Sequence, residues 1–477
     1  MHARRHSCRR DVRKVSAMLP MTRRQRRCGV TSAAPTYFEG LPADTATRAA
    51  AVDMPERFCK YDRRTRSLRR VFFNPNCSRE PRSRREDIIM YDWSAVDIDR
   101  LRSDRREAIA DLMRRHGLSH LLLTGFDHIR YATDYRMQII AEAFDWFAAV
   151  VDRDGGTEIF APWIDETHAA PVEELPWISK IHPTPSWSPM VGHPETWTAS
   201  LLGALTGATR VGIEMIDPAV LQRLKDALPA ADFVPIGREL YDVRIRKTAE
   251  EIRLLEDASI VNSLGAAAGL KAAQPGMTDH DVLAAIMATL QASGPEFLSH
   301  SLCNHGRGDG GWFAEGTVLA DGDPYFFDIG LYGRCGYASD IARTGFVGGD
   351  TRAAIKSVYA KLLKAHEVAA EAAKPGVRVS SIDDAVNDYL RSEGLPTTPY
   401  AIGHGVGLRA CELPTVYRGS LTDRDQVLVE NSVIALEPET GLEVDGRYIL
   451  LKLEDNYVVE HDGVRRLSPA GYGLDGL

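Results

Sequence analysis

Two aspartates lie in apolar segments that the sequence predicts to be paired strands. Asp328 follows the apolar run Tyr325–Phe327, and Asp340 lies in a second strand-like segment, 337–347. Three glycines between them are typical of the turn of a β-hairpin. A buried carboxylate must be paired, hydrogen-bonded or bound to a metal, and two that face each other across a hairpin repel unless a cation lies between them. The alternative is a pair of ordinary turn-edge aspartates.

Three further oxygen or nitrogen donors follow in strand-like or turn segments. His404 lies in the glycine-rich phrase Gly403–Leu408, and Glu437 and Glu454 each close an apolar strand. Taken singly, a histidine between glycines is typical of a turn, and an acid at a strand end is commonplace. Two aspartates, one histidine and two glutamates together supply hard donors that suit Mn, Co, Fe or Zn. That many carboxylates can also bridge two metal ions.

The elements around these residues repeat at a spacing of one hundred residues. Ala272–Thr278 and Ala372–Arg378 are closely related phrases, and each leads into a predicted helix start, at Thr278–Asp281 and at Ser380–Asp383. An earlier helix is predicted to begin at the capping box Thr248–Glu251. A repeat of this kind indicates a duplicated unit with an internal pseudo-two-fold axis. Helices interleaved with long hairpins indicate an α+β domain.

A smaller α/β domain is predicted before this unit, over residues 92–240, with a boundary near Tyr241–Lys247. Strands and helices alternate in it, and it does not concentrate catalytic residue types. We expect helices at 96–117, 196–205 and 219–227, and strands at 121–123, 144–151, 158–161, 211–214 and 233–236.

The composition is that of a globular protein outside the membrane. The chain has 477 residues, of which 44% are hydrophobic and 26% are charged. No run approaches the roughly 18 apolar residues that a membrane span requires, so no membrane partner is expected. Seven cysteines show no metal-binding spacing, which favours free thiols in a reducing, cytoplasmic compartment.

Residues 1–89 differ in charge from the rest of the chain. They hold 22 Lys and Arg against 9 Asp and Glu, whereas the remainder holds 36 against 57. Such a segment could be an arm that binds nucleic acid, or a transit peptide. The favoured interpretation is an over-long start, with translation beginning at Met90. We therefore expect residues 1–89 to be poorly ordered and expect no nucleic-acid partner.

The C-terminal motifs resemble those of a known family. Residues 247–469 are similar to the creatinase/prolidase/aminopeptidase P/methionine aminopeptidase family, which implies a pita-bread catalytic domain over 245–475. Residues 92–240 resemble the creatinase-type N-terminal domain of that family, through Ile129–Thr133 and Val211–Glu214. The matching catalytic phrases are Phe327–Gly330, Tyr337–Thr344, Gly403–Leu408, Leu436–Pro438 and Leu453–Asn456.

The resemblance implies a metal-dependent hydrolase similar to Xaa-Pro dipeptidases and aminopeptidases, acting on a dipeptide-like substrate. It implies that Asp340 and Glu454 bridge two divalent metal ions (Mn, Co, Fe or Zn), with Glu439 as a substitute for Glu437 if the strand register differs. In such peptidases a metal-bridging hydroxide attacks the scissile carbonyl, and the acid corresponding to Glu437 shuttles its proton. A manganese-dependent cytoplasmic homodimer is expected. The implied ligands are Asp328, Asp340, His404, Glu437 and Glu454.

The chain departs from the family pattern at three positions that carry histidines in the peptidases. Trp312, Tyr400 and Cys411 stand there instead, and we include these three, with Glu437 and His404, among the candidate catalytic residues. A thiol is a poor substitute for imidazole as a proton donor near neutral pH, and Cys411 is also a good small hydrophobe. His300 and His305 could compensate from the same region.

Two other functions remain open at this point. The altered histidines are similar to those of the dimethylsulfoniopropionate lyases of this family, so a lyase acting on a small zwitterion is the alternative. Those lyases carry a further aspartate where this chain keeps Gly330. The third possibility is a binding module without catalysis, against which the five retained ligands argue.

Overall fold

The computed structural model describes residues 95–136, 147–161, 173–183, 194–304, 312–419 and 424–473. The predictions for residues 1–89, for the first part of the strand 144–151 and for His305 lie outside the described residues. Among the described helices, none is long and apolar enough to cross a membrane.

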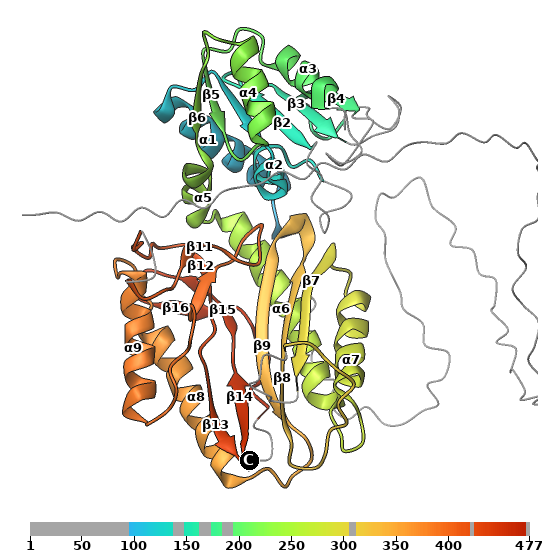
Figure 1. Ribbon diagram of the computed structural model, residues 1–477, viewed down its shortest axis with the longest axis vertical. Helices are drawn as coiled ribbons and strands as arrows, with labels where there is room; N and C mark the ends of the chain where they lie inside the picture. Colours follow the sequence, from blue (N-terminus) through green and yellow to red (C-terminus); the bar gives the residue numbers. More distant parts are fainter. Residues whose placement is uncertain are drawn as a thin grey trace, which may run out of the picture. The chain divides into compact units, whose positions relative to one another are not determined.

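The first domain is built on one mixed sheet in the strand order β4-β3-β2-β1-β5-β6. Strand β1 runs parallel to β5 and antiparallel to β2, and helices lie against this sheet (Figure 1). The expected α/β domain is confirmed, although α2, β4 and α5 were not predicted. The strands are β1 (His120–Leu123), β2 (Ala148–Asp152), β3 (Thr157–Ala161), β4 (Ile178–Pro183), β5 (Arg210–Ile213) and β6 (Asp232–Pro235); the helices are α1 (Ile98–His116), α2 (Phe126–Thr133), α3 (Pro194–Ala204), α4 (Pro218–Ala227) and α5 (Gly237–Ile245).

The second domain begins with two helices and a three-stranded antiparallel sheet in the order β7-β8-β9. These elements are α6 (Ala249–Ala272), α7 (Asp279–Ala292), β7 (Phe297–Asn304), β8 (Pro324–Tyr332) and β9 (Ala338–Phe346). Side chains of α6, α7 and β8 form one apolar core. In that core Gly269 of α6 lets this helix approach α7 closely, because a Cβ at position 269 would lie 2.7 Å from Ile286 Cδ1 of α7.

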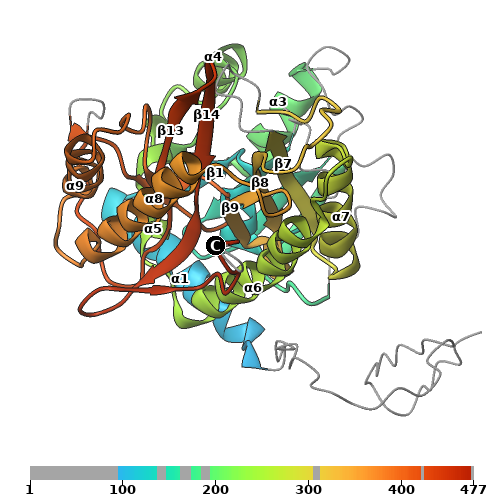
Figure 2. The same cartoon turned by 90° about the horizontal axis from the view of Figure 1, so that it is seen from below.

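The second half of this domain repeats the order of helix pair and sheet. Its larger sheet has the order β11-β10-β12-β15-β16, and β13 pairs with β14. Figure 2 shows α8 and α9 on one side of the domain and α6 and α7 on the other. The elements are α8 (Ala353–Ala372), α9 (Val379–Ser392), β10 (Gly403–Gly405), β11 (Glu412–Thr415), β12 (Val433–Leu436), β13 (Glu439–Val444), β14 (Arg447–Lys452), β15 (Asp455–Val459) and β16 (Val464–Arg466).

The two Pro-Gly turns have the same geometry, as the internal repeat predicts. Gly276 has φ +89° and Gly376 has φ +87°, a left-handed conformation that glycine adopts without strain. The N–H of Gly276 donates to Leu319 O and that of Gly376 to Leu428 O, both at 2.8 Å. Corresponding turns are thus held by corresponding partners.

All three predicted helices are present, with starts at Ala249, Asp279 and Val379. Thr248 with Glu251, and Thr278 with Asp281, form complete capping boxes. The start predicted at Ser380 is offset by one residue, because α9 begins at Val379 and Ser380 does not cap it. The Ser380 hydroxyl instead donates to Asp425 Oδ2 at 2.8 Å, a partner from a distant segment that the local pattern does not reveal.

Candidate metal centre

The predicted hairpin is formed by β8 and β9, and it places both aspartates on one face. Asp340 lies opposite Gly330, and Asp328 lies opposite Ala342. The two carboxylates are therefore diagonal neighbours rather than a directly facing pair. Side chains in this relation stand within reach of one another on the same side of the sheet.

The other three predicted ligands come from the second half of the domain. His404 is on β10, opposite Ala435 of β12. Glu437 directly follows β12, and its N–H donates to Ile402 O at 2.8 Å. Glu454 lies between β14 and β15, and its N–H donates to Ala342 O of β9 at 3.0 Å. That last bond ties the two halves together at the site.

The structure brings all five side chains into one cluster. The Nε2 atom of His404 lies 3.9 Å from Asp340 Oδ2, 3.5 Å from Glu437 Oε1 and 3.6 Å from Glu454 Oε1. All five residues are buried, with Glu454 only 1% exposed. The two halves of the duplicated domain thus supply a single site between them.

The arrangement of donor atoms fits divalent ions. Two groups of three donors, His300–Asp328–Asp340 and Asp340–His404–Glu454, have their ligand atoms within 4.8 Å of one another. The Oε1 atom of Glu454 is buried and has no hydrogen-bond partner among the described residues. Burial and the neighbouring carboxylates, Asp340 first, raise the pKa of Glu454 well above its ordinary value. Clustered oxygen and nitrogen donors of this kind suit divalent metal ions.

Asn456 holds the backbone of Asp340 in position. Its Oδ1 accepts from Asp340 N at 3.1 Å and from Ser339 Oγ at 2.8 Å. Its Nδ2 donates to Asp340 O at 2.8 Å. Asn456 is fully buried, so these bonds are shielded from water and restrict the direction of the Asp340 side chain.

Arg343 anchors the segment that carries Glu454. Its guanidinium donates to Glu454 O at 2.6 Å and to Asp455 Oδ1 at 2.5 Å. The ring of His404 is oriented separately, since its Nδ1 lies 3.1 Å from Gly405 O. That contact directs Nε2 toward the carboxylates, as is usual for metal-binding histidines.

Lys452 is a buried cation inside the cluster, and its role was not predicted. Its Nζ lies 2.9 Å from Asp328 Oδ2 and 2.7 Å from Glu437 Oε2. It also lies 5.0 Å from the ring centre of Trp312 and 5.9 Å from that of Tyr400. Despite its burial, the charges of Asp328 and then Glu437 raise the pKa of Lys452 well above its ordinary value.

Trp312 and Tyr400 form an aromatic wall beside Lys452, with ring centres 6.2 Å apart. The Tyr400 hydroxyl donates to Glu439 Oε2, so Glu439 is held by this bond and is part of neither donor group. Burial raises the pKa of Tyr400 far above its usual range. The wall borders the cluster from one side.

Cys411 stands apart from these contacts. It is exposed, and partial desolvation, with the charges of Glu437 and Asp340, raises the pKa of its thiol to about 11. The catalytic role of Cys411 stays a prediction.

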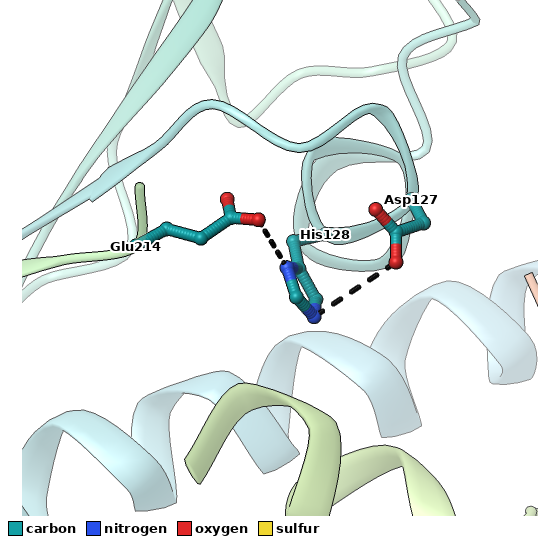
Figure 3. Close-up of side chains that lie close together, drawn as sticks. All are labelled: Asp127, His128 and Glu214. Carbon is teal, nitrogen blue, oxygen red and sulfur yellow. Dashed lines mark hydrogen bonds and ion pairs between the residues drawn. The ribbon is translucent and has the colours of Figure 1, made fainter. Parts of the chain in front are cut away.

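A third group of possible donors lies outside this cluster. Figure 3 shows His128 of α2 between Asp127 and Glu214, with its Nδ1 2.7 Å from Glu214 Oε1. Asp127 already binds the guanidinium groups of Arg244 and Arg409. Two guanidinium groups at one carboxylate disfavour a metal ion there, so this group is a structural ion-pair network.

Comparison with known proteins matches both domains. Residues 253–461 match the model of metallopeptidase family M24, and residues 105–246 match that of the creatinase/prolidase N-terminal domain. The chain is 31% identical over 252 residues to YkvY of Bacillus subtilis, whose name assigns it provisionally to the dipeptidases; the match covers 52% of this chain and 67% of YkvY. It is 27% identical over 270 residues to the Xaa-Pro dipeptidase of Pyrococcus furiosus, covering 55% and 75% of the two chains.

Solved structures share the fold. The prolidase of Pyrococcus horikoshii superposes with a TM-score of 0.63 at 21% identity, covering 78% of this chain and 99% of the prolidase. The dipeptidase PepE of Mycobacterium ulcerans superposes with a TM-score of 0.64 at 24% identity, covering 80% and 99%. The expected pair of folds is thereby confirmed.

Proposed function

This chain belongs to metallopeptidase family M24, and on that premise we propose that it is a dipeptidase that cleaves Xaa-Pro dipeptides with two divalent metal ions. It is a metal-dependent hydrolase, as the resemblance in its motifs predicted. The finer assignment concerns its substrate, the number of ions and the role of each residue. We also propose, from the family resemblance, manganese as the working ion and a homodimer as the assembly.

One observation carries the proposal. Asp340 belongs to both groups of three donors, so a single carboxylate can connect two ions. Asp328 completes the first position, while His404 and Glu454 complete the second. Bound metal ions would lower the pKa of a water molecule and polarise the scissile carbonyl of a peptide.

Glu437 is the residue proposed to transfer protons during peptide cleavage. Its Oε1 faces His404 and its Oε2 binds Lys452, so one oxygen is fixed while the other lies toward the cluster. This oxygen would accept a proton from water and return it to the leaving amine, in place of the histidines that this chain lacks. Despite its burial, Asp328 has a pKa well below its usual range, because the charge of Lys452 lowers it.

Trp312 and Tyr400 would bound the substrate. Their rings stand over the ammonium group of Lys452 and supply apolar surface next to polar donors, which is typical of small-molecule sites. A proline ring fits such a surface. The lyase alternative is not favoured, since the relatives named above are peptidases.

The test is a peptide panel with purified protein that has been stripped by chelator and reloaded with Mn or Co. Xaa-Pro dipeptides should be cleaved, Xaa-Ala dipeptides should be cleaved more slowly, and tripeptides that begin Xaa-Pro should separate dipeptidase from aminopeptidase activity. Two ions should bind per chain. Protein that binds both ions and cleaves none of these peptides would overturn the proposal.

A further inference from the structure

We propose that His300 is a sixth ligand of the metal centre, a nitrogen donor from β7 that binds an ion together with Asp328 and Asp340. The inference rests on the proposed function, because it concerns the ions of the same site. The ligand set implied by the family resemblance contains five residues and one histidine, and His300 is not among them.

The position of the His300 ring is the first argument. Its Nε2 lies 3.0 Å from Asp328 Oδ1 and 3.0 Å from Asp340 Oδ1. The nitrogen therefore points between the two carboxylates of the hairpin. The same relation is seen on the other side of Asp340, where His404 meets Glu454. Each of the two donor groups thus contains one imidazole.

The second argument is the hydrogen-bond partner of the other ring nitrogen. His300 Nδ1 lies 2.9 Å from Ser299 Oγ. With Nδ1–H donating to that hydroxyl oxygen, the lone pair of Nε2 would be available to a metal ion lying between the two carboxylates. Metal-binding histidines commonly have such a partner on the other ring nitrogen. His404 is oriented in the same way by Gly405 O.

The third argument is the space that β8 leaves for the ring. His300 lies opposite Gly330 in the sheet. A Cβ at Gly330 would lie 2.6 Å from His300 Nδ1 and would also collide with Cε1 of that ring and with Ser299 Oγ. Any larger side chain there would displace the ring, so glycine at 330 and histidine at 300 depend on each other.

A competing role for His300 is that of a donor that only holds Asp328 in place. Lys452 Nζ already binds the other oxygen of that carboxylate at 2.9 Å. Asp328 is therefore fixed without His300, and a structural donor would not have to approach Asp340 as well. A ligand role for His300 explains its short contacts with both Asp328 and Asp340.

The experiment compares cobalt-loaded wild-type protein with His300→Ala and Gly330→Ala. Equilibrium dialysis measures metal binding, and cobalt absorption and X-ray absorption spectra report the imidazole ligands. In His300→Ala, one of the two ions should bind about 100-fold more weakly, and the imidazole signal should fall by about half. Gly330→Ala should reproduce both changes although it removes no donor atom.

Matched controls are His461→Ala, at an exposed histidine, and Gly349→Ala, where a Cβ meets no atom within 4 Å. Both should keep the wild-type spectrum. An unchanged imidazole signal in His300→Ala, in protein that still binds two ions and cleaves Xaa-Pro, would overturn the sixth ligand and leave the proposed function standing. If wild-type protein cleaves no peptide, the proposed function is wrong, and the imidazole signal alone then decides whether His300 is a metal ligand.

Discussion

Lys452 is the residue whose charge most affects the candidate site. Its ammonium group is 3% exposed and binds Asp328 and Glu437. Removing one partner of a buried ion pair leaves the other charge without compensation, which is far more costly than losing an exposed pair. Bound metal ions would supply positive charge to the same carboxylates.

The change Lys452→Met should therefore destabilise chelator-treated protein by about 3–5 kcal/mol, and metal-loaded protein by less. Urea unfolding of both forms measures the difference. Lys364→Met is the control, because Lys364 forms only exposed ion pairs. An equal loss in the two forms would mean that metal ions do not share carboxylates with Lys452.

Asp340 has the most consequential position among the proposed ligands, since it lies in both donor groups. Asp340→Asn should lower the occupancy of both ions, and peptide cleavage should fall about a thousandfold or more, the equivalent of about 4 kcal/mol of transition-state stabilisation. Metal analysis and turnover measure the two effects. Exposed Asp462→Asn should retain both; full metal content in Asp340→Asn would contradict the shared-ligand arrangement.

Single residues also show where the sequence stops being informative. Asp328, Asp340, His404, Glu437 and Glu454 could be predicted because each lies in a short phrase with a family counterpart. His300 was singled out only as a possible substitute for a missing histidine, and no sequence pattern predicts its contacts or those of Lys452. Their contacts depend on how β7 pairs with β8, and on how β14 pairs with β13 and packs against β8, which is a matter of three-dimensional packing.

At the level of elements, α5 links the first domain to the strand next to His404. Arg244 of α5 is 2% exposed, and it binds Asp127 of α2 and Glu412 of β11. Glu412 also accepts from Lys247 Nζ at 2.7 Å. Because β11 pairs with β10, the first domain braces the strand that carries His404.

Replacing Arg244 by Met should destabilise the protein by about 3–5 kcal/mol, because Asp127 and Glu412 would lose a buried partner. Chemical unfolding measures this loss. The control is Arg223→Met, since the pair of Arg223 with Glu195 is exposed and worth about 0–1 kcal/mol. A loss as small as that of the control would show that the network does not brace the domains.

Helix α6 carries a carboxyl group whose protonation state changes near neutral pH. Asp257 is 1% exposed, its oxygens have no hydrogen-bond partner among the described residues, and burial raises its pKa to about 7. The folded state therefore holds a proton that the unfolded chain releases near pH 4. The protonated Asp257 carboxyl therefore makes its full contribution to stability below pH 4, and this contribution is lost as the pH rises to 7.

Asp257→Asn should thus stabilise the protein at pH 8 by about 2 kcal/mol, and the gain should shrink toward pH 4. Urea unfolding across this range measures it. Exposed Asp384→Asn should show no such trend. A gain that does not change with pH would mean that Asp257 is ionised in the folded protein throughout.

The elements themselves were predictable to different extents. The hairpin of β8 and β9 and the helix starts at Thr248 and Thr278 have local signals in turn glycines and capping residues. Strand β4 alternates too weakly to be recognised, and α5 overlaps the segment that the sequence suggests as a boundary. The start of α9 was predicted to within one residue, but the bond from Ser380 to Asp425, 45 residues away, has no local signal.

On the scale of the whole molecule, the site couples folding to metal binding. Its donors come from β8 and β9 in one half of the second domain, and from β10, the end of β12 and the β14–β15 connection in the other. The unfolded chain cannot hold these donors together, so ions bind the folded state preferentially. Ions at about 100 times their dissociation constant would stabilise it by about 2.7 kcal/mol each.

Chelation should therefore lower the melting temperature by several degrees, and added Mn or Co should restore it in proportion to the logarithm of free metal. Because Arg244 and Arg409 join Asp127 to the second domain, both domains should shift together in one calorimetric transition. Mg is the matched control, since it binds imidazole poorly. A chelator-induced shift confined to one of two separate transitions would contradict the coupling, whereas a single transition that Arg244→Met divides into two would identify the network as its cause.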